Sequence, residues 1–246
     1  MDPTTVAALA ILFVIAAALY SSVGHGGASA YVAAMALFSV APETIKPTAL
    51  ALNLLVAGFG AWRYWRRGLT NGKLVLAFAL TATPAAFVGG GIHLPAIYYK
   101  PLVGILLWLA AARLLWHPKA LADRAVEAPS PSITLPAGAV LGLLAGLTGT
   151  GGGIFLSPLI ILMAWEEPRR TSGVVSAFIF LNSAAGIAGN AASVGHLPHE
   201  LPIFLLSVAA GAFIGTWLGV ERLPRPWLLR TLGLVLTVAG AKLLFT

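Results

Sequence analysis

Long apolar runs, separated by short polar segments, dominate this chain. Six of these runs are long enough for transmembrane helices, because crossing about 30 Å of hydrocarbon takes about 20 helical residues. They cover residues 45–65, 73–92, 97–116, 171–194, 201–220 and 226–245. The pattern predicts an all-α polytopic membrane protein.

Glycine clusters interrupt two further apolar blocks, residues 4–40 and 135–165. The interrupting residues are Gly24, His25, Gly26 and Gly27 in the first block and Gly149, Thr150, Gly151, Gly152 and Gly153 in the second. At 1.5 Å per residue, each arm of the second block would reach about 22–24 Å. Each block is therefore expected to form a helical hairpin whose tip ends inside the membrane, which gives eight to ten membrane helices in total.

The composition excludes an ordinary soluble protein. Hydrophobic residues make up 59% of the 246 residues and charged residues 9%, against about 45–50% and 25% in soluble domains. The net charge of +7 does not indicate a nucleic-acid partner, because the basic residues lie in short loops between apolar runs, as in membrane proteins. The chain has no cysteine, and no metal site or cofactor is expected. The first apolar run, residues 6–19, lacks a basic leader and is interpreted as a retained membrane segment.

The two halves of the chain resemble each other. Residues 117–134 contain prolines and charges without apolar periodicity, which indicates a linker between an N-terminal repeat, residues 1–116, and a C-terminal repeat, residues 135–246. Residues 98–115 match residues 227–244 at an offset of 129, which places Gly104 on Gly233. The glycine clusters match at an offset of 125. An internal duplication explains both matches, although leucine- and alanine-rich helices can also match by chance.

The distribution of positive charge orients the repeats. Cytoplasmic loops carry the excess of lysine and arginine, and placing the loops at residues 63–73, 113–124, 169–170 and 222–230 inside accounts for 12 of the 15 basic residues. Lys46, Lys100 and Lys242 then fall on the outer side, the linker is cytoplasmic and both termini are outside. The halves become two inverted repeats, each a glycine-broken hairpin plus three transmembrane helices. Inverted repeats with broken helices are typical of secondary transporters.

The glycine breaks are the first candidate site. Lipid does not tolerate the unpaired backbone groups of a broken helix, so a break indicates a polar cavity. A new helical arm follows each break, and its N-terminal N–H groups attract anions. Glycines can instead allow close helix packing. We prefer that explanation for five other glycines, which are Gly58, Gly60, Gly89, Gly90 and Gly91.

Several polar side chains accompany the breaks. His25 is the one ionisable residue expected deep in the bilayer, where it could carry a proton or be a neutral ring bonded to a backbone carbonyl. Asn53, Asn182, Ser183, Thr48 and Ser176 could bind oxyanions or could join helices. The predicted substrate-binding residues are Gly24, His25, Gly26, Gly27, Asn53, Gly149, Thr150, Gly151, Gly152, Gly153, Asn182 and Ser183. Three other histidines, His93, His196 and His199, are interpreted as surface residues.

No enzymatic motif is present in the membrane segments, and no catalytic residue is expected. The cluster at residues 149–153 lacks the Lys-Ser/Thr of a P-loop, and no Gly-x-Ser-x-Gly or His-Glu-x-x-His occurs. A transporter of a small anion is therefore the preferred function. An intramembrane enzyme, or a structural membrane subunit that uses the same cavity, is the alternative.

The repeated unit resembles the TauE/SafE family of sulfite exporters and related anion permeases over nearly the whole chain. The unit is an apolar run into a glycine cluster, an apolar arm, and then Thr48-Ala49 or Ser176-Ala177 on the next helix. The second half matches the pattern better, with a Gly-x-Gly-Gly-Gly string followed by Pro158, whereas the first half has Ala28 and no proline in its arm. The resemblance implies an inner-membrane carrier for sulfite, sulfonates or similar anions, driven by the proton-motive force.

Overall fold

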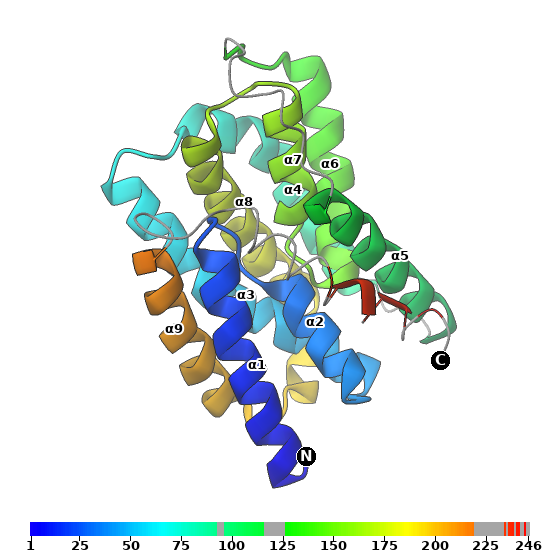
Figure 1. Ribbon diagram of the computed structural model, residues 1–246. Helices are drawn as coiled ribbons and strands as arrows, with labels where there is room; N and C mark the ends of the chain where they lie inside the picture. The colour runs from blue at the N-terminus through cyan, green and yellow to red at the C-terminus, as the bar shows by residue number, and fades with distance from the viewer. Residues whose placement is uncertain are drawn as a thin grey trace.

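The computed structural model describes residues 1–92, 96–115 and 126–218, and residues 234, 236–238, 240, 241 and 244 near the C-terminus. All regular structure within these residues is helical. The helices are α1 (Pro3–Ser21), α2 (Ala28–Leu37), α3 (Pro42–Arg66), α4 (Gly72–Gly91), α5 (Ala96–Leu115), α6 (Pro131–Thr148), α7 (Gly153–Leu162), α8 (Pro168–Gly189), the short 3₁₀ helix η1 (Ala191–His196) and α9 (Leu201–Leu218) (Figure 1). Six of them are long and apolar enough to cross a membrane, which confirms the all-α membrane class.

Five predicted spans coincide with helices to within a few residues, namely those that became α3, α4, α5, α8 and α9. Proline in the first turn begins α3 and α8, because proline has the φ of a helix and no N–H that needs a partner there. The side chain of Asn71 caps α4 by accepting from Leu74 N. Most of the sixth predicted span, residues 226–245, lies outside the described residues.

Both glycine-interrupted blocks are broken helices, α1 with α2 and α6 with α7. The expectation of two similar arms in the second block was wrong. The α6 arm has 18 residues and the α7 arm has 10, or about 27 Å and 15 Å of helix. Ser130 caps α6 so that the helix begins at Pro131, inside the stretch predicted as a linker, while α7 ends at Leu162 before a turn with Ala164 at positive φ.

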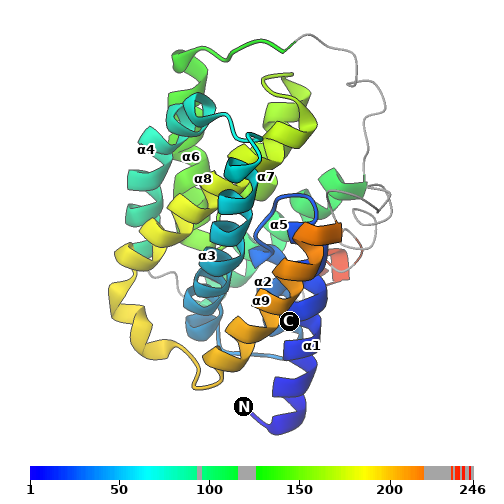
Figure 2. The same cartoon turned by 90° about the vertical axis from the view of Figure 1, so that its left-hand side faces the viewer.

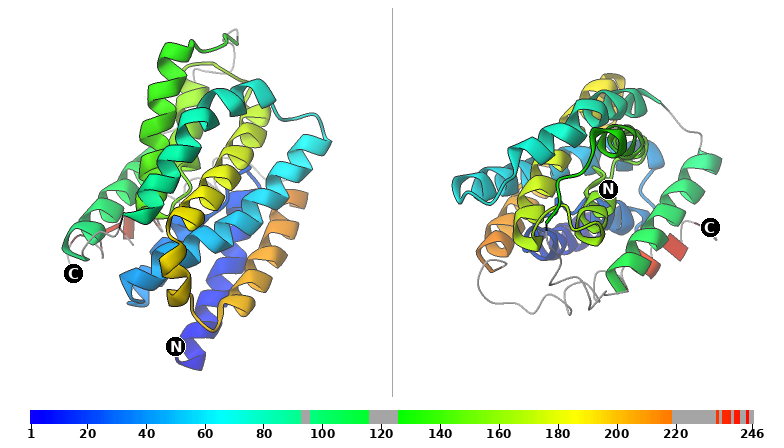
Figure 3. Two further views of the ribbon diagram at one scale, coloured as in Figure 1. Left: turned by 180° about the vertical axis from the view of Figure 1, so that it is seen from behind. Right: turned by 90° about the horizontal axis from the view of Figure 1, so that it is seen from above.

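The two broken helices enter the bundle from opposite ends. Helix α1 rises from the end that holds the N-terminus and α2 returns toward it, whereas α6 and α7 lie at the other end (Figures 1 and 2). Both breaks therefore lie in the interior of the bundle. Helix α5 lies at its edge, beside the described C-terminal residues (Figure 3), where Trp108 Nε1 donates to Thr237 O at 3.0 Å.

Glycines bring neighbouring helices into backbone contact. Any side chain would overlap a carbonyl of the adjacent helix at Gly142 and Gly146 of α6, which face α4, and at Gly211 and Gly215 of α9, which face α1. Small residues four apart permit such close packing in membranes. Gly89, Gly90 and Gly91 face carbonyls of neighbouring helices in the same way, and Gly58 and Gly60 face the side chains of Phe180 and Ser176 on α8, which agrees with a packing role for all five.

The outer surface of the bundle is apolar. Large side chains on several helices are exposed, including Leu206 at 72%, Trp65 at 67% and Leu76 at 66%. Lipid chains can cover such a surface without cost, whereas a monomeric soluble protein rarely exposes large continuous apolar areas. The arrangement therefore places the polar interior, with the two breaks, inside a lipid-facing shell.

Candidate functional site

Left-handed backbone conformations shape both breaks. Gly24 and Gly27 have φ of 77° and 98°, and Gly149, Gly151 and Gly152 have φ of 71°, 74° and 75°. Only glycine adopts these values without strain. The clusters thus end one helix and begin the next within a few residues, which leaves the N-termini of α2 and α7 inside the protein.

The two breaks lie on either side of the same pair of side chains, Asn53 on α3 and Ile179 on α8. A Cβ at Gly26 would overlap Asn53 Oδ1 and lie 3.2 Å from Ile179 Cγ2. A Cβ at Gly151 would overlap Asn53 Nδ2 and lie 2.9 Å from the same methyl carbon. Backbone segments 125 residues apart therefore approach each other around one amide and one aliphatic side chain.

Asn53 joins the breaks to the helices around them. Its side chain is fully buried, Oδ1 accepts from Ala28 N at 3.3 Å and Nδ2 donates to Ser183 Oγ at 3.0 Å. The first bond gives α2 an N-terminal cap supplied by another helix, since Gly27 has no side chain to do so. The second bond ties α3 to α8, the helices that follow the first and the second break.

Asn182 is equally buried but is not used in this way. Its exposure is 0%, and neither Oδ1 nor Nδ2 has a hydrogen-bond partner among the described residues. A buried polar group without a partner costs about 1–3 kcal/mol. Of the two predicted asparagines, one is thus part of the scaffold and the other presents an unused amide.

Several other residues named from the sequence are hydrogen-bonded within the protein. Gly24 O accepts from Ser176 Oγ at 2.6 Å, and the hydroxyls of Thr148 and Thr150 lie 2.9 Å apart. His25 is half-buried, and its Nδ1 lies 3.0 Å from Val23 O, which agrees with the alternative of a ring bonded to a backbone carbonyl. The site thus gathers the glycines, His25, Asn53, Thr150, Asn182 and Ser183 in the interior.

Other polar residues named from the sequence lie elsewhere. The Thr48 hydroxyl is buried without a hydrogen-bond partner in the described chain, but at five residues from Asn53 it lies on a different face of α3. His196 and His199 are exposed, as expected for surface residues. His93 lies outside the described residues.

Lys46 is a buried charge that sequence reasoning placed at the outer side. Its exposure is 8%, and Nζ donates to Gly89 O, Gly90 O and Ile92 O at 2.9–3.1 Å. The ammonium thus caps the C-terminal end of α4, where the helix dipole favours a cation. Lys46 is therefore a buried ionisable residue that the sequence analysis did not single out. Pro42 indicates that α3 begins before Lys46, but nothing in the neighbouring sequence shows that this lysine is buried.

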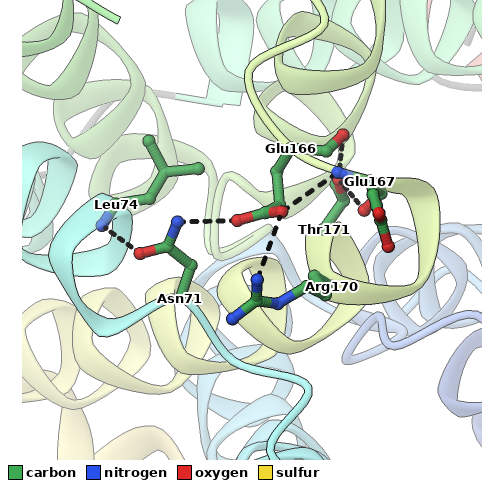
Figure 4. A network of polar contacts seen from close by, with 6 residues as sticks. All are labelled: Asn71, Leu74, Glu166, Glu167, Arg170 and Thr171. Atoms are coloured by element: carbon green, nitrogen blue, oxygen red, sulfur yellow. Dashed lines mark hydrogen bonds and ion pairs between the residues drawn. The ribbon is translucent and has the colours of Figure 1, made fainter. Parts of the chain in front are cut away.

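A second polar cluster lies at the other end of α4, away from the breaks (Figure 4). Asn71 Nδ2 donates to Glu166 Oε2 at 2.6 Å, Glu167 N donates to Glu166 Oε1 at 3.1 Å, and Arg170 Nη1 lies 4.0 Å from the same oxygen. Glu166 is buried at 5% exposure. The cluster fastens the start of α4 to the connection between α7 and α8.

Replacing Asn71 with alanine is expected to lower the free energy of unfolding by about 2 kcal/mol, because α4 loses its N-cap and the buried Glu166 carboxylate loses a donor. Ser130→Ala is the control, since Ser130 caps α6 at an exposed position without contacting a buried charge. That variant should lose about 1 kcal/mol or less. Thermal unfolding in detergent measures both, and equal losses would contradict the role given to Glu166.

Comparison with known proteins identifies the family to which the chain belongs. Residues 9–243 match the family described as Sulfite exporter TauE/SafE. The chain is 40% identical to the probable membrane transporter protein y4hK of Sinorhizobium fredii, over 96% of this chain and 97% of that protein. It is 30% identical to the probable membrane transporter protein YjnA of Bacillus subtilis, over 92% and 95%. No solved structure matches the chain. The family resemblance and the preference for a membrane transporter over an enzyme are confirmed.

Proposed function

Because the chain belongs to the TauE/SafE sulfite exporter family, we propose that it is a secondary transporter that moves small sulfur-containing or organic anions, such as sulfite or sulfonates, across the inner membrane. The observation that carries this proposal is the meeting of two glycine-broken helices around Asn53 and Ile179. The N-terminus of a helix attracts an anion through its N–H groups and dipole. Two such ends in one interior provide positive potential there.

We further propose that the two halves are inverted repeats. Contacts of the two breaks support this, because each break lies against the helix that follows the other break. The position of a Cβ at Gly24 lies against Ser172, and the position of a Cβ at Gly149 lies 3.0 Å from Lys46 O. Gly24 and Gly149 are 125 residues apart, and Lys46 and Ser172 are 126 apart. Two-fold related units make contacts in this paired manner.

The directions of the helices support the same proposal. Contacts between glycines and neighbouring backbones show that α1 runs parallel to α9 and that α4 runs parallel to α6. Gly58 lies close to Phe180 and Gly186 lies close to Leu50, which shows that α3 runs antiparallel to α8. In the proposed duplication α1 corresponds to α6, α3 to α8 and α4 to α9. One broken helix would then serve each side of the membrane, and rocking of one repeat against the other would expose the anion alternately.

Counterflow in proteoliposomes tests the transport function. Vesicles that contain the protein and are loaded with unlabelled sulfite should accumulate radiolabelled sulfite transiently, and sulfate, thiosulfate and short sulfonates should be compared as internal anions. Chemical conversion of an anion without translocation would favour the alternative of an intramembrane enzyme. Absence of both counterflow and conversion for all of these anions would reject the proposed function.

Proton coupling through His25 is a separate expectation. His25→Gln keeps a hydrogen-bonding side chain that cannot carry a proton, so transport of isethionate, a sulfonate that does not itself titrate in this range, should lose most of its dependence on pH between about 6 and 7.5, where histidine normally titrates. His199→Gln, at an exposed position, should behave as wild type. An unchanged pH profile for His25→Gln in proteoliposomes would leave His25 with a structural role only.

Labelling of introduced cysteines tests the orientation, since the chain has no cysteine of its own. Ala128 is exposed before α6, and a side chain at Gly195 would meet no atom within 4 Å. In intact cells a membrane-impermeant thiol reagent should label Gly195→Cys and not Ala128→Cys. The reverse pattern would place the linker outside and overturn the proposed topology.

A further inference from the structure

The amide of Asn182 is the polar group beside the breaks that the fold leaves unused. It is fully buried, and both of its polar atoms are without partners in the part of the chain that the structure describes. Asn53 has both amide atoms bonded. Burying an unpaired amide destabilises a folded protein, so a bound group that satisfies Asn182 would offset a cost that the empty protein carries.

The spacing of residues along α8 places Asn182 on the same face as the residues that contact the start of α7. The stripe formed by Val175, Phe178 and Asn182 shares one face of the helix, because these residues are spaced by three and four. Val175 Cγ1 lies 2.9 Å from the position of a Cβ at Gly153, and Phe178 Cε1 lies 3.2 Å from that of Gly152. Asn182 lies one helical turn beyond Phe178 on this face, and from this spacing we infer that its side chain lies beside the second break.

The N-terminus of α7 lacks the cap that α2 has. Asn53 Oδ1 accepts from the first N–H group of α2. Gly152, the N-cap residue of α7, has no side chain, and no side chain of the described residues accepts from Gly153 N or Ile154 N. The first N–H groups of a helix have no partner within the helix. An open, anion-attracting helix end thus lies beside an unused amide.

We propose that Asn182 selects anions that carry their own hydrogen-bond donor next to their anionic oxygens. This inference rests on the proposed function. The N–H groups of α7 bind the anionic oxygens, Nδ2 of Asn182 donates to an oxygen, and Oδ1 accepts from an O–H or N–H of the ligand. An anion with acceptors only would leave Oδ1 unpaired and facing negative charge. Hydrogensulfite, or a sulfonate with a hydroxyl or amino group, satisfies both atoms.

For sulfite this selection has a direct consequence for coupling. The acid form brings its proton into the site on its own oxygen, where Asn182 Oδ1 accepts the O–H. The anion and the proton then cross together without a change in the protonation state of any side chain. Transport of sulfite would depend on pH through the ligand even in the His25→Gln variant.

Calorimetry in detergent with matched ligands tests the proposal. Isethionate and ethanesulfonate differ by one hydroxyl, taurine carries an ammonium instead, and sulfite is titrated on either side of its second pKa. Three of these ligands carry a hydrogen-bond donor, namely isethionate, taurine and hydrogensulfite. Wild-type protein should bind at least one of them at least about tenfold more tightly than the matching ligand without a donor, which is ethanesulfonate for the first two and sulfite for the third. Tenfold corresponds to about 1.4 kcal/mol. The pair of ligands that shows this preference identifies the O–H or N–H group that Asn182 recognises.

The outcomes separate this inference from the proposed function. Binding and counterflow without any donor preference would overturn the role of Asn182 and leave the transporter intact. Absence of binding for every anion, together with absence of counterflow, would reject both. A donor preference that persists in Asn182→Leu would also overturn the assignment to this residue.

The stability of the Asn182→Leu variant provides a second test. Asn182→Leu removes two unpaired polar atoms and keeps the size of the side chain, so its melting temperature should equal or exceed that of wild type. Asn53→Leu is the matched control, because it leaves Ala28 N and Ser183 Oγ without their partner and should melt earlier. Destabilisation of Asn182→Leu as large as that of Asn53→Leu would mean that the amide is paired within the protein and would overturn the proposal.

Discussion

Replacing Gly26 with alanine is expected to lower the free energy of unfolding by about 3 kcal/mol, at the upper end of the cost of overpacking a core. Its added Cβ would overlap Asn53 Oδ1 and press on Ile179. Asn53 would have to move, and the bond that caps α2 through Ala28 N would be lost. Because Gly26 does not have positive φ, the whole effect is steric.

The control for Gly26→Ala is Gly68→Ala. Gly68 has a φ of 68°, but nothing lies within 4 Å of its Cβ position. Its substitution should cost only the backbone strain of about 1–2 kcal/mol. Thermal unfolding in detergent and sulfite counterflow should both be measured. A Gly26→Ala protein that unfolds and transports like wild type would mean that the tips do not meet around Asn53.

Replacing Lys46 with methionine is expected to lower the free energy of unfolding by about 2–3 kcal/mol. Methionine keeps an apolar chain of similar length but cannot donate, so three carbonyls at the end of α4 lose their donor, and bonds to a charged donor contribute about 1.5–3 kcal/mol. Lys73→Met, at an exposed position, should be nearly neutral. Thermal unfolding of both variants tests this prediction. Equal stabilities of the two variants would contradict the role of Lys46 as the cap of α4.

The features that could be predicted from the sequence are local. Apolar runs of about 20 residues located most of the membrane helices, because the thickness of the bilayer fixes their length. Gly24 and Gly27, and their counterparts after Thr148, marked the breaks, because a helix cannot continue through left-handed residues. These features depend only on neighbours in the chain.

The features that could not be predicted depend on contacts between distant segments. Asn53 and Asn182 looked alike in the sequence, yet one bonds to Ser183, 130 residues away, and the other has no partner in the described chain. Lys46 is buried because its ammonium reaches the end of α4, 43 to 46 residues further along the chain. No local pattern distinguishes such a lysine from one at a membrane surface.

Crystals grown with selenite, an analogue of sulfite, would test the central claim most directly, because the anomalous signal of selenium locates the anion. The account predicts a selenium peak in the interior, at the second break, beside the N-terminus of α7 and within hydrogen-bonding reach of Asn182. Peaks found only at basic groups on the surface, such as Arg169 and Lys73, in a protein that carries sulfite in proteoliposomes, would contradict it.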